Sequence, residues 1–139
     1  MNNLFIIFLF LFALFTTSSS VPFEVCGKGP LSVTKFDFIP NPIVAGQDLI
    51  VNIEGSTQVE VKQGSTLTLS TYELFLPLHQ TFDFCKMSIC PIHIGDFNFN
   101  ITYPIPGAAK MFDGNSVNLT LSNPDKTLLT CIEFTAHFA

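Results

Sequence analysis

Apolar and polar residues alternate with a period of two along much of this chain. The segment Asp96–Tyr103 shows the pattern most clearly, because large apolar residues occupy every second position and polar residues occupy the positions between them (DFNFNITY). Side chains of a β-strand point alternately to opposite faces of the sheet, so this segment would bury one face and expose the other. The alternation therefore predicts β-strands rather than amphipathic helices.

Turn-forming residues interrupt the alternation at short intervals. Gly, Pro, Asn and Asp, which supply the positive or fixed φ angles of turns, occur at Gly27–Pro30, Pro40–Pro42, Gln63–Ser65, Asp113–Asn115 and Asn123–Asp125. Short strands at this spacing predict an all-β, two-sheet antiparallel sandwich without helices. The expected strands are Phe23–Cys26, Leu31–Ile39, Leu49–Glu54, Gln58–Lys62, Thr66–Leu76, Thr81–Cys85, Asp96–Tyr103, Ser116–Ser122 and Thr127–Phe138.

The first twenty residues differ from the rest of the chain because they contain none of its 6 basic or 11 acidic residues. The apolar run Leu4–Phe15 is shorter than the roughly 18 to 20 residues of a membrane span, and it suits a signal-peptide h-region of about 7 to 15 residues. Ser18 and Ser20 suit cleavage before Val21. We therefore expect residues 1–20 to be a signal peptide, with a membrane anchor as the alternative, and residues 21–139 to form one domain.

The expected domain contains four cysteines, which are Cys26, Cys85, Cys90 and Cys131. An even number of cysteines behind a signal peptide predicts two disulfides, for which the sequence allows three pairings. The middle two are close enough to close one loop and the outer two lie near the ends of the domain, so we favour Cys85–Cys90 and Cys26–Cys131. The alternative is a zinc site that adds His79 and His93, but its spacing matches no common set of zinc ligands, and we expect no metal.

Two N-glycosylation sequons occur in predicted strands. They are Asn100-Ile101-Thr102 and Asn118-Leu119-Thr120. A glycan requires an Asn that faces solvent, and the alternation places both of these Asn residues on the polar faces of their strands. We therefore expect Asn100 and Asn118 to be glycosylated.

Composition and motifs argue against two classes of function. The chain has no arginine and a net charge of −5, which does not suit binding to a phosphate backbone, so we expect no nucleic-acid partner. It contains no G-x-S-x-G elbow, no P-loop and no H-E-x-x-H motif, and its three histidines are scattered. We therefore expect no catalytic residues and no cofactor.

The number of phenylalanines leaves a choice about the interior of the sandwich. The chain has 16 Phe and no Trp, and most of the Phe residues follow the expected signal peptide. Such rings are ordinary core residues of a sandwich. Composition cannot distinguish a filled core from two apolar sheet faces that are held apart around a bound molecule.

Several short motifs resemble the ML lipid-recognition family, and the phosphatidylglycerol/phosphatidylinositol transfer proteins within it are the most similar branch. The Niemann-Pick type C sterol carriers are similar but more distant, because they have a further disulfide in their early part. The motifs are Thr81–Cys85, Cys90–His93, Gly95–Phe97, Tyr103–Pro106 and Thr130–Glu133, together with the turn from Asn41 to Gly46.

The resemblance implies an immunoglobulin-like, two-sheet antiparallel sandwich with a lipid cavity between the sheets. It also implies a secreted or endolysosomal lipid-transfer protein, without enzymatic activity, that binds the tails of a phospholipid and contacts membranes transiently. We expect it to be a monomer. A sterol carrier and a non-carrier lipid-recognition co-receptor have the same fold and remain the alternatives.

Given this resemblance, the alternation predicts which residues face the lipid. They are Leu67, Leu69, Phe97, Phe99, Ile101, Tyr103, Val117, Leu119 and Leu121. The connection Ile105–Gly114 is unusually apolar for a loop, so we expect Met111 and Phe112 to form a docking tip beside the mouth of the pocket. Lys110 would add attraction to an anionic bilayer. The alternative is that Phe112 simply closes the end of the sandwich as a core residue.

Overall fold

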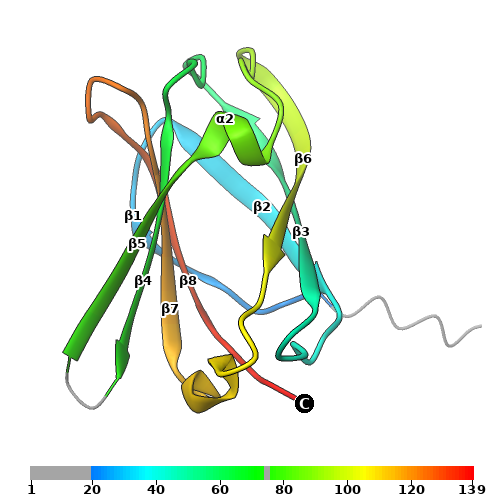
Figure 1. Cartoon of the computed structure of the whole chain (residues 1–139). Helices are drawn as coiled ribbons and strands as arrows, with labels where there is room; N and C mark the ends of the chain where they lie inside the picture. The colour runs from blue at the N-terminus through cyan, green and yellow to red at the C-terminus, as the bar shows by residue number, and fades with distance from the viewer. Residues whose placement is uncertain (1–19, 74–75) are drawn as a thin grey trace, which may run out of the picture.

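The computed structural model describes residues 20–73 and 76–139 and is an antiparallel β-sandwich (Figure 1). The predicted signal peptide lies outside the described residues except for Ser20. In the part that is described, no helix has the length and apolar character to span a membrane. The elements are β1 (Glu24–Gly27), β2 (Leu31–Ile39), β3 (Asp48–Thr57), β4 (Thr66–Glu73), β5 (Leu76–Asp83), α2 (Phe84–Met87), β6 (Gly95–Pro104), the 3₁₀ helix η1 (Ala109–Phe112), β7 (Ser116–Ser122) and β8 (Leu128–Thr135).

The strands form two sheets that face each other. One sheet has five strands in the order β1-β8-β7-β4-β5, and the other has three in the order β2-β3-β6. All the strand pairs within these sheets are antiparallel. Figure 1 shows α2 at one end of the sandwich and η1 at the opposite end. The predicted all-β, two-sheet architecture is therefore confirmed.

Apolar side chains from both sheets fill much of the space between them. Phe36 on β2 and Phe134 on β8 come from opposite sheets, and their ring centroids lie 5.0 Å apart. Phe84, Leu129 and Ile132 are fully buried in the same core. Each fully buried large side chain contributes about 1.5 to 3 kcal/mol, so this shared core holds the sheets together.

The predicted strands Leu31–Ile39 and Ser116–Ser122 have the predicted bounds. The predicted strand Thr66–Leu76 is wrong at its end, because Leu76 begins the next strand, β5. The sequence has no Gly or Asn between these two strands, so the alternation gives no sign that one strand ends and another begins. Pro77 then lies in β5, which is an edge strand and so tolerates a residue that lacks an N–H group.

The predicted strand Gln58–Lys62 is also wrong. Only Val61 in this segment forms a bridge, to Ile92 outside the named strands. The backbone N–H of Lys62 instead donates to the side-chain oxygen of Asn123 at 3.0 Å. Asn123 is buried, and its own amide donates to the backbone carbonyl of Glu60 at 3.0 Å. A side chain distant in sequence therefore takes the place of a neighbouring strand.

The expectation of no helices is wrong in two places, α2 and η1. The predicted strand Thr81–Cys85 ends at Asp83, where one helical turn begins. The carboxylate of Asp83 accepts a hydrogen bond from the backbone N–H of Cys85 at 3.0 Å, which caps this turn. The fully buried side chain of Phe84 anchors the turn in the core, so capping and burial outweigh the local strand pattern.

Two disulfides cross-link the fold, with the pairing that the sequence favoured. Cys26–Cys131 joins the neighbouring strands β1 and β8 across a separation of 105 residues. Cys85–Cys90 closes the loop that follows α2, with a separation of 5 residues. Because all four sulfurs are in bridges, the alternative zinc site with Cys85 and Cys90 as thiolate ligands does not form.

We predict that the long-range bridge stabilises the domain more than the local one. In the chain-entropy model, removing Cys26–Cys131 as a double Ala variant costs about 5 kcal/mol, whereas removing Cys85–Cys90 costs about 2 kcal/mol. Urea unfolding of both variants under the same conditions measures the difference. Equal losses, or a larger loss for Cys85–Cys90, would contradict this prediction.

Candidate functional site

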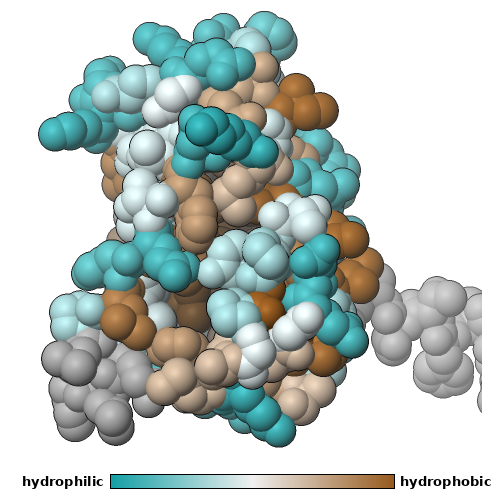
Figure 2. All heavy atoms as spheres, viewed as in Figure 1, coloured by the Kyte–Doolittle hydropathy of each residue, from teal (hydrophilic) through white to brown (hydrophobic). Residues whose placement is uncertain are grey.

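A cavity of about 330 Å³ lies between the two sheets at the η1 end of the sandwich. In the space-filling view (Figure 2), apolar surface is recessed between more polar residues in the lower half of the face shown. Strands of both sheets, η1 and the chain after β8 all contribute to the cavity wall. The lining residues are Ile43, Leu49, Leu69, Thr71, Leu78, His79, Gln80, Tyr103, Ile105, Pro106, Ala108, Ala109, Met111, Phe112, Val117, Phe134, Ala136 and Phe138.

The size of the side chains explains why this end is hollow. Ala109 and Ala136 are buried at the cavity wall, and Val117 is the inward residue of β7 nearest to η1. The aromatic residues of the core hold the two sheets apart. Methyl and isopropyl groups are too short to fill the space between sheets at that separation. An apolar cavity wall offers few hydrogen-bond partners to water and suits an apolar molecule.

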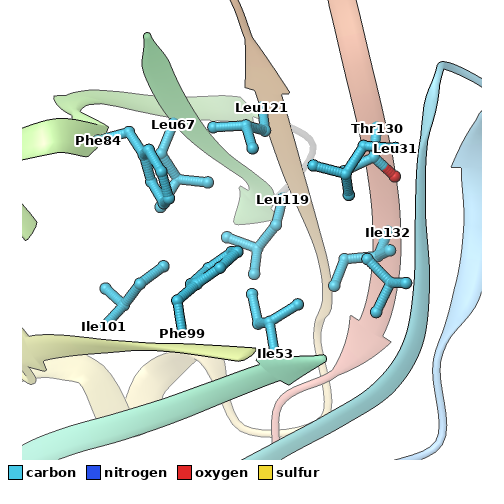
Figure 3. Close-up of a pocket in the computed structure, with 11 residues that line it drawn as sticks. Leu31, Ile53, Leu67, Phe84, Phe99, Ile101, Leu119, Leu121, Thr130 and Ile132 are labelled. Atoms are coloured by element: carbon cyan, nitrogen blue, oxygen red, sulfur yellow. The ribbon is translucent and has the colours of Figure 1, made fainter. Parts of the chain in front are cut away.

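The opposite end of the interior is filled. The remaining void there measures about 20 Å³, roughly the volume of one water molecule. Figure 3 shows large side chains that converge on it from both sheets and from α2, among them Leu67, Phe84 and Phe99. The rings of Phe84 and Phe99 meet edge to face, with centroids 5.2 Å apart. This half of the sandwich is therefore ordinary core.

The hollow and filled halves lie on the same inward faces of the same strands. On β4, Leu69 lines the cavity and Leu67 lines the small void. On β7, Val117 lines the cavity and Leu119 lines the small void. Two residues along a strand therefore separate the hollow half from the filled half.

The predicted lipid-facing residues divide between these two halves. Those at the cavity are Leu69, Tyr103, Met111, Phe112 and Val117. Those at the small void are Leu67, Phe99, Ile101, Leu119 and Leu121. Phe97 lines neither space and instead stacks on Phe99 with ring centroids 5.3 Å apart, next to an outer groove. The alternation identified the inward face of each strand but carried no information about which part of that face is hollow.

Several cavity residues were not predicted. Leu49 on β3 and Phe134 on β8 lie in predicted strands and alternate with more exposed residues, so the same signal could have identified them. Ile43 and Phe138 form an isolated parallel bridge between distant parts of the chain. No local pattern in the sequence indicates that bridge.

Only four of the lining residues carry polar side-chain atoms, namely Thr71, His79, Gln80 and Tyr103. The hydroxyl of Thr71 donates to the backbone carbonyl of Ser116 at 2.9 Å, so its donor is already used. The Oγ of Ser70 and the Nδ1 of His79 are hydrogen-bonded at 2.8 Å. The hydroxyl of Tyr103 donates to Oε1 of Gln80 at 2.8 Å, which joins strands of opposite sheets.

Burial raises the pKa of Tyr103 above its ordinary value. Its hydroxyl therefore keeps its proton at neutral pH and remains a hydrogen-bond donor. The described lining contains no acidic residue and no lysine, so the cavity presents an apolar wall with a few neutral polar groups along the β5 and β6 side. Such a wall suits an apolar molecule that has a polar end.

The η1 helix forms the rim of the cavity. Met111 is 59% exposed although it also lines the cavity, and the neighbouring Lys110 is exposed. Phe112 is half-buried and lines the cavity wall. An apolar side chain that is exposed beside an apolar cavity provides a continuous apolar path from the interior to the surface.

Comparison with known proteins identifies one family and relatives that share a functional name. The family model of the ML domain matches residues 20–138. A phosphatidylglycerol/phosphatidylinositol transfer protein of Aspergillus fumigatus is 26% identical over 109 residues, which cover 74% of this chain and 62% of that protein. A Dictyostelium discoideum protein, provisionally assigned as a phosphatidylglycerol/phosphatidylinositol transfer protein, is 27% identical over 108 residues. These residues cover 73% of this chain and 72% of that protein.

The fold also matches a solved structure. The crystal structure of a Niemann-Pick type C2 protein from the Japanese carpenter ant superposes with a TM-score of 0.68 at 17% identity. The superposition covers 85% of this chain and 99% of that one. At this identity the match concerns the fold alone.

We predict that replacement by Phe has different effects on stability at two successive inward positions of β7. Val117→Phe adds a ring where the cavity has room, so we expect the free energy of unfolding to stay within about 1 kcal/mol of the wild type or to rise. Leu119→Phe adds bulk where only a water-sized void exists, and we expect a loss of about 1 to 3 kcal/mol. Urea unfolding of the two variants tests this contrast, and similar losses in both would show that the cavity end is as tightly packed as the other.

Proposed function

This chain belongs to the ML domain family, and we propose that it binds a phospholipid by enclosing acyl chain in the cavity beside η1 and transfers that lipid between membranes. The family consists of lipid-binding proteins that are not enzymes. The observation that carries the proposal is the apolar cavity, which has the position and lining that a lipid tail requires. Both the choice of phospholipid and the transfer step belong to the proposal.

The energetic basis of transfer is burial of methylene groups. A lipid tail that leaves a bilayer loses about 0.8 kcal/mol for each methylene group that water then surrounds. A cavity lined almost entirely by apolar side chains replaces the bilayer for the enclosed part of the tail. Enclosure of even a few methylene groups lowers the cost of leaving the membrane by several kcal/mol.

The relatives support phosphatidylglycerol or phosphatidylinositol as the lipid, because they are named for both. The chain offers no arginine for bidentate binding of a phosphate. The polar side chains described in the cavity wall include no lysine, aspartate or glutamate. We therefore propose that the tails provide most of the affinity and that the head group contributes modest selectivity.

We also propose that the protein acts in the secretory pathway, either outside the cell or in the endolysosomal lumen. Two disulfides suit an oxidising compartment, and residues 1–20 have the composition of a cleaved signal peptide. The proposed working unit is a monomer, since the cavity is formed by one chain.

The direct test is identification of the bound lipid. The protein is purified from the medium of a eukaryotic host that expresses the full chain, extracted with organic solvent, and the extract is examined by lipid mass spectrometry. We expect a stoichiometric phospholipid. A sterol would instead support the sterol-carrier alternative, and the absence of any lipid would support a recognition module that does not carry lipid.

The exposed part of η1 provides a membrane contact in this proposal. Met111 lies at the mouth of the cavity, and Lys110 beside it adds about 1 kcal/mol of attraction to an anionic surface. Contact at this end would bring the mouth to the bilayer, so that a tail could move between membrane and cavity without crossing water.

We predict that Met111→Ser slows lipid transfer from anionic vesicles several-fold. The expected cause is weaker membrane contact, and the melting temperature should remain nearly unchanged because Met111 is mostly exposed. Ile89→Ser is the matched control, since Ile89 is 83% exposed and lies just after α2, at the opposite end of the sandwich. Equal transfer rates for both variants and the wild type would contradict the docking role of η1.

Glycosylation of Asn100 and Asn118 is a further part of the proposal. Asn100 is exposed on β6 and accepts a hydrogen bond from the amide of Asn52 at 2.8 Å. Asn118 is partly exposed on β7, between the inward residues Val117 and Leu119. Both side chains therefore lie on the outer faces of their sheets, where an attached glycan would not enter the cavity.

We predict that glycosidase treatment increases the gel mobility of protein made in a eukaryotic host. Asn100→Gln and Asn118→Gln should each remove part of the shift, and the double variant should remove all of it. Secreted wild-type protein whose mobility is unaffected by glycosidase would show that neither sequon is used.

A further inference from the structure

The two sheets are tied together differently at their two margins. At one margin, β1 and β2 belong to opposite sheets and follow each other in the chain with only residues 28–30 between them. The backbone N–H of Val21 also donates to the carbonyl of Phe36 across this margin at 3.0 Å. Covalent linkage and packing therefore hold this margin closed.

At the other margin, the edge strands β5 and β6 face each other without pairing. Within the described residues, β5 pairs only with β4, and β6 pairs only with β3. Figure 1 shows β5 and β6 on different sheets at the same margin of the sandwich. At the α2 end, α2 and the loop closed by Cys85–Cys90 carry the chain from β5 to β6 across this margin, so it is toward the cavity end that side-chain contacts hold the margin.

Tyr103 makes the principal contacts between these two strands. Its hydroxyl donates to Gln80 at 2.8 Å, and its ring meets the ring of Phe82 edge to face with centroids 5.5 Å apart. Both Tyr103 and Gln80 line the cavity, so their hydrogen bond forms part of the cavity wall. The width of the cavity on this side therefore depends on that bond.

The size of the cavity indicates what this bond controls. Sites for drug-sized molecules measure about 300 to 1,000 Å³, and a cavity of about 330 Å³ is at the lower end of that range. One acyl chain has the bulk of such a molecule, and a phospholipid with two chains has twice that bulk. Extension along the strands is blocked, because the adjacent part of the interior is filled down to a void of about 20 Å³.

We propose that the Tyr103–Gln80 hydrogen bond is a specificity determinant that favours lipids with one acyl chain over lipids with two. This inference rests on the proposed function and specifies the substrate class. With the bond in place, the cavity accommodates one chain. A second chain requires β5 and β6 to separate, which breaks the bond and the contact between Tyr103 and Phe82. Two-chain phospholipids are therefore bound at the cost of this opening.

The experiment compares two lipids that share the head group and differ in the number of acyl chains, a free hydroxyl replacing the second ester in the one-chain lipid. Lipid-free secreted protein is incubated with equimolar phosphatidylglycerol and lysophosphatidylglycerol of the same chain length, and native mass spectrometry gives the ratio of the two complexes. We expect the one-chain complex to predominate in the wild type. Tyr103→Phe removes the donor of the bond, and Gln80→Leu removes the acceptor. Each variant should raise the ratio of two-chain to one-chain complex about fivefold, which is the change expected from the loss of one ordinary hydrogen bond.

Two further variants separate the bond from general effects of substitution. Gln80→Glu keeps an acceptor for the Tyr103 hydroxyl and should retain the wild-type ratio. Tyr72→Phe removes the hydroxyl of the other tyrosine, which is 64% exposed and does not line the cavity, and it should also retain that ratio. Because every variant receives the same lipid mixture, a change in the ratio reflects the protein.

The outcomes distinguish this inference from the proposed function. If both lipids bind but the ratio is the same in the wild type, Tyr103→Phe and Gln80→Leu, the role of the bond is disproved and phospholipid binding stands. A predominance of the two-chain complex in the wild type would also disprove it. If no variant binds either lipid, the proposed function fails, and the inference fails with it.

Discussion

The protein depends on the packing of aromatic and aliphatic side chains between two apolar sheet faces. Phe36 and Phe134 meet across the sheets near one margin, and Phe84 and Phe99 meet at the α2 end. These large rings set the distance between the sheets over the whole sandwich. At the η1 end, Val117, Ala109 and Ala136 are too small to span that distance, and a cavity results. The hollow therefore lies where small inward side chains coincide, while large rings fill the rest of the interior.

The sequence predicted much of this architecture because its strongest signals are local. Alternation gave the inward face of β6 and β7, and the positions of the cysteines along the chain favoured the bridges that form. The errors occurred where distant residues decide the outcome. The side chain of Asn123 replaces a partner strand for the backbone near Lys62, and the burial of Phe84 together with the cap at Asp83 converts the end of a predicted strand into a helical turn.

The sequence also predicted only part of the candidate site. Ten of the eleven residues expected to face a lipid do face the interior, but only five of them line the cavity. The boundary between filled and hollow parts depends on which side chains of the other sheet lie opposite each strand. The alternation of a single strand contains no such information, so Leu67 and Leu69 look equivalent in the sequence although they line different spaces.

The margin between β5 and β6 has two properties that bear on lipid binding. It is held by contacts weak enough to break, because a hydrogen bond contributes about 0.5 to 1.5 kcal/mol and an aromatic pair contributes a similar amount. It also lies next to the cavity, so its separation would widen the space for a ligand directly. The chain crosses both margins, at residues 28–30 between β1 and β2 and at residues 84–94 between β5 and β6, and the second crossing lies at the α2 end, away from the cavity (Figure 1).

The cavity also has a thermodynamic consequence. An apolar molecule that enters it supplies contacts that side chains supply in a filled sandwich, so a bound ligand becomes an exchangeable part of the hydrophobic core. Because the unfolded chain has no such cavity, each tenfold rise in ligand concentration above the dissociation constant adds about 1.4 kcal/mol to the free energy of unfolding. The stability of the domain is thus coupled to its occupancy, and the domain with an empty cavity is less stable than the domain with a filled one.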